Sequence, residues 1–92
     1  MNWQPVESSQ IEALGYDPEV EYPLGVKFPP TKKQKAESLP GSAYEYANVS
    51  PELFNMFINA KTNPEYDNSI GVFFHRVIKA HPELYPYRRI GG

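Results

Sequence analysis

The chain has 92 residues, of which 40% are hydrophobic, 14% aromatic and 22% charged, so it is too apolar for an intrinsically disordered segment. It contains no cysteine, which excludes disulfides and thiolate metal ligands and favours a reducing compartment. A formal net charge of −2 argues against a surface built throughout to bind a phosphate backbone. We expect one domain over residues 1–92, since a chain of this length holds one modest core.

The start of the chain, Met1 to Pro5, has neither the basic residues nor the apolar run of a signal peptide. No stretch approaches the roughly 18 apolar residues that cross a membrane. We therefore expect a cytoplasmic protein with no membrane contact.

Three segments alternate between apolar and polar residues with the period of two that is typical of strands. They cover residues 8–15, 22–28 and 43–49. In the last segment Tyr44 and Tyr46 share one face, and aromatic residues in this position usually pack across a neighbouring strand. The simplest assembly is a three-stranded antiparallel meander, with a further short edge strand as a variant.

Residues 29–41 separate the second and third predicted strands. The segment carries Lys32, Lys33 and Lys35 and shows no apolar periodicity, so it is predicted to be an exposed loop. Its lysines could reach phosphate groups, and the alternative is a loop that is only solvated.

The hydrophobic period changes to that of helices after residue 49. Ser50, Pro51 and Glu52 supply an N-cap, a proline at the first helical position and an acid in the first turn. The helix that begins there ends before Pro64, because proline cannot donate to the preceding turn. A second amphipathic helix is predicted from about Asp67 to the His81-Pro82 pair. A small sheet packed on two C-terminal helices makes an α+β fold.

The tail, residues 82–92, is too aromatic for a disordered end and too rich in proline for a helix. We expect it to lie extended against the domain or against a partner subunit. Tyr85 and Tyr87 alternate with prolines beside Arg88 and Arg89, a combination that can stack on a base and pair with a phosphate. The alternative is that the tyrosines only fix the tail to the core or to another copy.

The residues that common catalytic mechanisms need are not grouped in this sequence. His75 and His81 are six positions apart, so they lie on different faces of a helix and do not form a metal-binding pair. No serine lies in a strand–turn–helix elbow, and no glycine-rich phosphate loop is present. We therefore predict no enzyme activity, no metal and no cofactor.

A polar groove is a further candidate for ligand binding. Hydroxyl groups on adjacent strands could line it, with an arginine of the second helix as the partner of an anion. The residues concerned are Ser8, Ser9, Tyr16, Tyr44, Tyr46 and Arg76. The alternative is that the tyrosines pack in the core and across strands, as strand tyrosines commonly do.

Five short motifs in this order resemble the KTSC domain family, over roughly residues 5–80. They are Val6-Glu7-Ser8-Ser9-Gln10-Ile11, Leu14-Gly15-Tyr16-Asp17, Leu24-Gly25-Val26-Lys27-Phe28, Tyr44-Glu45-Tyr46-Ala47-Asn48-Val49, and Phe57 with Ala60. The family is named for its occurrence at the C-terminus of some lysyl-tRNA synthetases, and it also stands alone in bacterial and phage proteins. The resemblance implies no defined activity, although the synthetase association points to RNA. The sequence departs from the family pattern at residues 29–41 and 61–66, and the tail lies outside the resemblance.

We expect a non-catalytic, stand-alone binding module that binds or sequesters a nucleotide-type small ligand. In a phage it would hold a nucleotide-derived signal in the host cytoplasm, and a domain this small would form its pocket at a homo-oligomer interface. The alternatives are an RNA- or tRNA-binding accessory module and a protein-interaction domain. The candidate ligand-binding residues are Ser8, Ser9, Tyr16, Tyr44, Tyr46, Arg76, Tyr87, Arg88 and Arg89.

Overall fold

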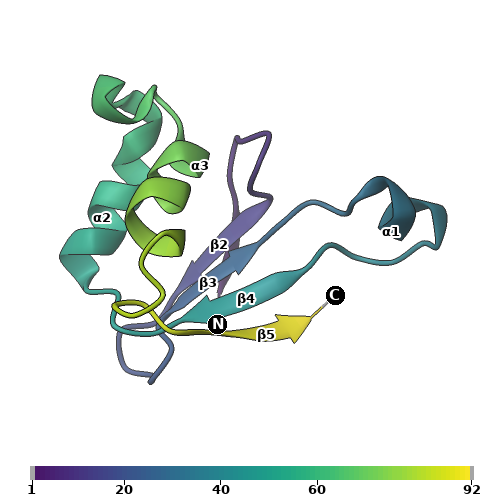
Figure 1. Ribbon diagram of the computed structural model, residues 1–92, viewed down its shortest axis with the longest axis horizontal. Coiled ribbons are helices and arrows are strands. Elements are labelled where there is room, and N and C mark those ends of the chain that lie inside the picture. Colours follow the sequence, from purple (N-terminus) through teal and green to yellow (C-terminus); the bar gives the residue numbers. More distant parts are fainter. Residues whose placement is uncertain (1, 92) are drawn as a thin grey trace.

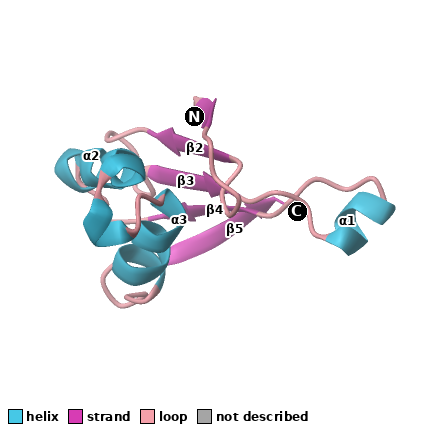
Figure 2. Ribbon diagram, turned by 90° about the horizontal axis from the view of Figure 1, so that it is seen from above, coloured by secondary structure: helices cyan, strands magenta, loops and turns pink. Residues whose placement is uncertain are grey.

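A computed structural model describes residues 2–91, and its central feature is a five-stranded antiparallel sheet with helices on one face (Figures 1 and 2). Each strand pairs with the next strand in the chain, so the sheet is a meander. The strands are β1 (Trp3–Pro5), β2 (Ala13–Tyr16), β3 (Leu24–Lys27), β4 (Ala43–Tyr46) and β5 (Tyr87–Gly91). The predicted α+β class and meander are confirmed, but the count of three strands was too low, because β1 and β5 extend the sheet at its two edges.

The first predicted strand, residues 8–15, was wrong in its first half. The Ser8 hydroxyl oxygen accepts hydrogen bonds from the backbone N–H groups of Gln10 (3.1 Å) and Ile11 (3.3 Å), which bends the chain there. The strand β2 begins only at Ala13. A side chain that satisfies its own neighbouring backbone competes with the sheet ladder, which explains the late start.

The first predicted helix is confirmed as α2 (Pro51–Asn59), which continues as a single 3₁₀ turn, η1 (Ala60–Thr62). The Ser50 hydroxyl accepts the N–H of Leu53 at 3.1 Å, as expected of an N-cap.

The second helix begins later than predicted, at residue 70. It consists of α3 (Ile70–Phe73) and the wider π-helical turns of η3 (Phe74–Lys79). Before it lies a separate 3₁₀ turn, η2 (Pro64–Tyr66), and both Asp67 and Asn68 have a φ of 54°, which no helix accommodates.

Residues 29–41, which we call the arm, contain a short helix that was predicted as loop. This helix, α1 (Lys32–Ala36), starts with a capping box in which Thr31 and Gln34 satisfy each other's backbone N–H groups. None of its residues is buried, and it stands away from the rest of the domain in both views (Figures 1 and 2). The segment thus contains a short exposed helix where a loop without secondary structure was expected.

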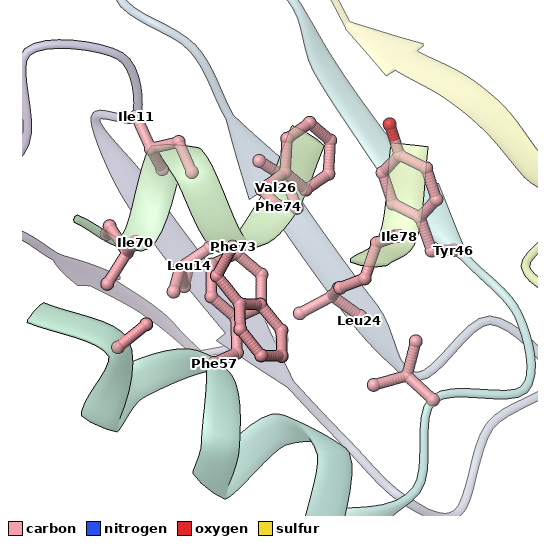
Figure 3. Packing of buried hydrophobic residues seen from close by; sticks show 12 residues of the cluster. Ile11, Leu14, Leu24, Val26, Tyr46, Phe57, Ile70, Phe73, Phe74 and Ile78 are labelled. Atoms are coloured by element: carbon pink, nitrogen blue, oxygen red, sulfur yellow. The ribbon is translucent and has the colours of Figure 1, made fainter. Parts of the chain in front are cut away.

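The hydrophobic core lies between the sheet and the two C-terminal helical segments (Figure 3). Its centre is a group of phenylalanines, in which the Phe57 ring stacks on Phe73 at 5.3 Å and on Phe74 at 6.1 Å between centroids. The other members of the cluster are Ile11, Leu14, Leu24, Val26, Tyr46, Val49, Ala60, Ile70 and Ile78. This packing holds both helices on the face of the sheet that carries Tyr44 and Tyr46.

The tail, which was predicted to be extended, begins with a turn in which the N–H groups of Leu84 and Tyr85 donate to the carbonyl oxygen of His81, and it then docks on its own domain. The N–H of Ala47 donates to the carbonyl oxygen of Pro86 at 2.8 Å, and the Asn48 side chain donates to the carbonyl oxygen of Leu84 at 3.0 Å. From Tyr87 onward the tail pairs with β4 as strand β5. The last residue of the predicted tail, Gly92, lies outside the described residues.

Candidate functional site

Four tyrosines gather where β4, β5 and the end of the second helix meet. They are Tyr44, Tyr46, Tyr85 and Tyr87, which we call the tyrosine cluster. Alternation along β4 puts Tyr44 and Tyr46 on the helix side of the sheet, and Tyr87 of β5 lies opposite Tyr46 in the register. The Tyr87 ring centroid is 5.9 Å from that of Tyr44 and 5.7 Å from that of Tyr46. The pairing of β5 with β4 is therefore what assembles the cluster.

The tyrosine cluster lines a cavity of about 250 Å³, which we call the tyrosine cavity. The lining residues are Phe28, Tyr44, Tyr46, Ile78, Lys79, Pro82, Tyr85 and Tyr87. The sheet forms one wall, while the end of η3 and the turn that follows it form the other. Lys79 is the single charged residue of this lining, which otherwise consists of aromatic and aliphatic side chains.

The members of the tyrosine cluster differ in exposure. Tyr46 is only 5% exposed, whereas Tyr87 is 57% exposed and forms the outer rim. Burial raises the pKa of Tyr46 to about 12, and the neighbouring Tyr44 and Tyr87 add to the shift. Tyrosine is neutral at physiological pH even at its ordinary pKa of about 10, so Tyr46 offers a hydroxyl and an aromatic face, and the raised pKa extends its neutral range to higher pH.

The lining of the tyrosine cavity is suited to binding by its chemistry. It contains no carboxylate, thiol, imidazole or aliphatic hydroxyl, which are the groups that most often act as nucleophile or general base. Phenol rings and one ammonium group can stack on a flat ligand, donate hydrogen bonds and attract an anion.

Tyr16 lies at a different cavity, of about 600 Å³, between β1 and α2. Its ring stacks on Phe54 with 4.5 Å between centroids, and its hydroxyl donates to the carbonyl oxygen of Val49 at 2.7 Å. Burial, and secondly the charge of Glu52, raise the pKa of the Tyr16 hydroxyl. The structure thus separates Tyr16 from the other predicted tyrosines.

The remaining members of the predicted groove line neither cavity. Ser8 holds the bend before β2, and Ser9 is exposed beside it. Arg76 forms an ion pair with Asp67 at 3.4 Å and donates to the carbonyl oxygen of Glu65 at 3.2 Å. These contacts join residues 65–67, which precede α3, to η3.

The two arginines of the tail point to opposite faces of the sheet. Arg88 is opposite Glu45, pairs with its carboxylate at 2.8 Å, and lies 4.3 Å from the centroid of the Tyr22 ring. Arg89 is opposite Tyr44, on the same face as the tyrosine cluster, and donates to the Ser42 hydroxyl at 3.3 Å. Of the pair, Arg89 is therefore the one on the face of the sheet that holds the tyrosine cavity, although it does not line the cavity.

Five lining residues were not among the predicted site residues. They are Phe28, Ile78, Lys79, Pro82 and Tyr85. The helical periodicity puts Lys79 towards solvent, and only the turn after η3 shows that Tyr85 folds back beside it. The alternation of Tyr85 with Tyr87 was the one signal in the sequence, because both flank the same proline.

Within residues 2–91 no group of three or more His, Cys, Asp or Glu side chains could hold a metal ion. In the same part of the chain no helix has the length and apolar content needed to cross a bilayer.

The fold and cavity define a small α+β domain, in which an antiparallel meander packs on two helical segments and encloses a tyrosine-lined pocket. Residues 7–81 match the KTSC domain family, and the chain belongs to that family. It is also similar to a protein of Tsukamurella paurometabola, described only as a protein, with 39% identity over 67 residues. That match covers 73% of this chain and 84% of the relative.

Proposed function

We propose that this protein is a non-catalytic binding module that holds a nucleotide-type small ligand in the tyrosine cavity. One observation carries the proposal: four tyrosines and Phe28 surround a cavity that has a single charge, the ammonium group of Lys79. Aromatic side chains can stack on any nucleobase, and each stacked base contributes about 1–3 kcal/mol to the free energy of binding.

The size of the cavity supports a particular placement of the ligand. Its volume of about 250 Å³ is below the roughly 300–1,000 Å³ of common ligand pockets. A base would fill it, and the sugar and phosphate would lie at the rim beside Tyr87. The ammonium group of Lys79 lines the cavity and would pair with the phosphate, and Arg89 adds a second positive charge on the same face of the sheet.

The experiment is a thermal-shift series with nucleotides and cyclic nucleotides. Binding to the native state alone adds about 2.7 kcal/mol at a hundredfold excess over Kd, which raises the melting temperature of a domain this small by roughly ten degrees or more. We expect at least one member of the panel to give such a shift. A panel without any shift would contradict the proposal.

Two pairs of variants connect the shift to the cavity. Lys79→Ala and Tyr87→Ala each remove a lining side chain, and we expect both to reduce the ligand-induced shift. Lys61→Ala and Tyr22→Ala remove residues of the same types that do not line the tyrosine cavity, and they should keep the shift. Equal shifts in all four variants would place the ligand elsewhere.

Salt separates this function from RNA binding. A pocket that holds one or two phosphates responds weakly to salt, whereas a protein that neutralises many phosphates loses affinity steeply as salt rises. We expect the weak response.

A further inference from the structure

Two connections at opposite ends of β3 carry opposite charge. The arm joins β3 to β4, and residues 17–23, which we call the acidic loop, join β2 to β3 (Figure 1). The arm holds three lysines and one glutamate, Glu37, so its formal charge is +2 (3 − 1). The acidic loop holds Asp17, Glu19 and Glu21 and no basic residue, which gives −3.

Each connection also exposes an aliphatic side chain among its charges. Leu39 of the arm is 49% exposed, and Val20 of the acidic loop is 46% exposed. Single exposed apolar residues are common on protein surfaces, so the complementarity of the two surfaces lies in their opposite charge. Leu39 and Val20 add one apolar side chain each to a contact between them.

The arm is an ordered element. Besides the capping box of α1, the N–H of Leu39 donates to the carbonyl oxygen of Gln34 at 2.7 Å, which closes the turn after the helix. At its base Gly41 is buried, and a Cβ added there would overlap the Phe28 carbonyl oxygen. An element ordered before binding loses less entropy when it docks.

Within one copy the two surfaces do not meet. They lie at the two ends of β3, a four-residue strand that spans about 13 Å, and the arm extends away from the domain (Figures 1 and 2). We propose that the arm of one copy docks on the acidic loop of a second copy. Because every copy carries both surfaces, each can donate its arm and receive another, which produces a ring or a chain of copies.

The experiment measures molar mass by light scattering and sedimentation over a series of concentrations and salt. We expect the wild-type mass to exceed that of one chain at low salt and to fall as salt rises, since contacts between exposed charges are screened. A wild-type protein that stays monomeric under every condition would overturn the proposal.

Charge reversal tests the pairing of arm with loop. The arm variant is Lys32→Glu/Lys33→Glu/Lys35→Glu, and the loop variant is Glu19→Lys/Glu21→Lys. Asp17 is kept because its carboxylate accepts the N–H of Glu19 and shapes the turn. In each variant alone the arm and the loop carry net charges of the same sign and repel each other, so we expect monomers.

An equimolar mixture of the two variants is the matched control. The acidic arm of one then meets the basic loop of the other, and the converse pair is also complementary, so the mixture should recover the wild-type mass. This recovery also shows that both variants fold. A mixture that stays monomeric while wild type assembles would contradict the pairing.

Single changes give a second control. Lys33→Glu should lower the mass at a given concentration more than Lys61→Glu, which makes the same charge change on η1. If variants of the arm lysines lost RNA binding but still formed oligomers, that result would also overturn the proposal.

Discussion

Tyr46 belongs to the core and to the tyrosine cavity at once. Its ring packs edge-on against Phe74, with 5.4 Å between centroids, and its other neighbour is Tyr87 at the rim. One side chain thus couples the packing of η3 on the sheet to the shape of the pocket. This double role makes its ionisation a probe of stability.

Stability should fall at high pH because of Tyr46. Its pKa is about 12 in the folded chain and about 10 in the unfolded chain, so the unfolded state loses the proton first as pH rises. The stabilisation is complete below pH 10 and is lost progressively between about pH 10 and 12, with a total of roughly 2–3 kcal/mol. Urea unfolding of wild type and Tyr46→Phe at pH 8, 10 and 11 measures this change. The free energy of unfolding should fall more steeply in wild type, and parallel pH curves would contradict the assignment.

Elements that carry their own periodicity could be predicted from the sequence, while those formed by tertiary pairing could not. β3 and α2 were predicted because alternation and an N-cap are local signals. β1 is three residues long, too short for a period, and β5 contains adjacent arginines in place of an alternation. Both become strands only because a neighbouring strand offers a partner. The helix α1 was missed although it has a local signal, because Thr31 and Gln34 have the spacing of a capping box, which is typical of a helix start.

The base of the arm depends on the glycine at position 41. In Gly41→Ala the new Cβ would overlap the Phe28 carbonyl oxygen and lie 2.7 Å from the Pro29 carbonyl carbon, so the backbone would have to move. We expect a loss of about 1–3 kcal/mol in the free energy of unfolding, measured by urea denaturation. Gly91→Ala is the control, because its Cβ would meet only the Ala43 Cβ at an ordinary 3.8 Å. Equal stabilities of the two variants would contradict the close contact.

For the molecule as a whole, residue types pointed to the candidate site better than residue spacing did. Tyr44, Tyr46 and Tyr87 come together because β5 returns beside β4, although 40 residues separate Tyr87 from Tyr46 (87 − 46 − 1). The sequence could not show that Tyr16 and Arg76 lie outside the tyrosine cavity. A strand pattern shows which residues share a face, but not which helix covers each part of it, and α2 covers Tyr16 while η3 covers Tyr46.

We propose above all that the protein holds a nucleotide-type ligand without converting it. The most direct measurement incubates the protein with a mixture of nucleotides, removes unbound material by filtration, releases the retained ligand by heat and identifies it by chromatography and mass spectrometry. We predict one compound, chemically unchanged and at no more than one molecule per site, which Lys79→Ala and Tyr87→Ala retain poorly. A product formed in amounts above that of the protein, or a filter that retains no nucleotide, would contradict the account.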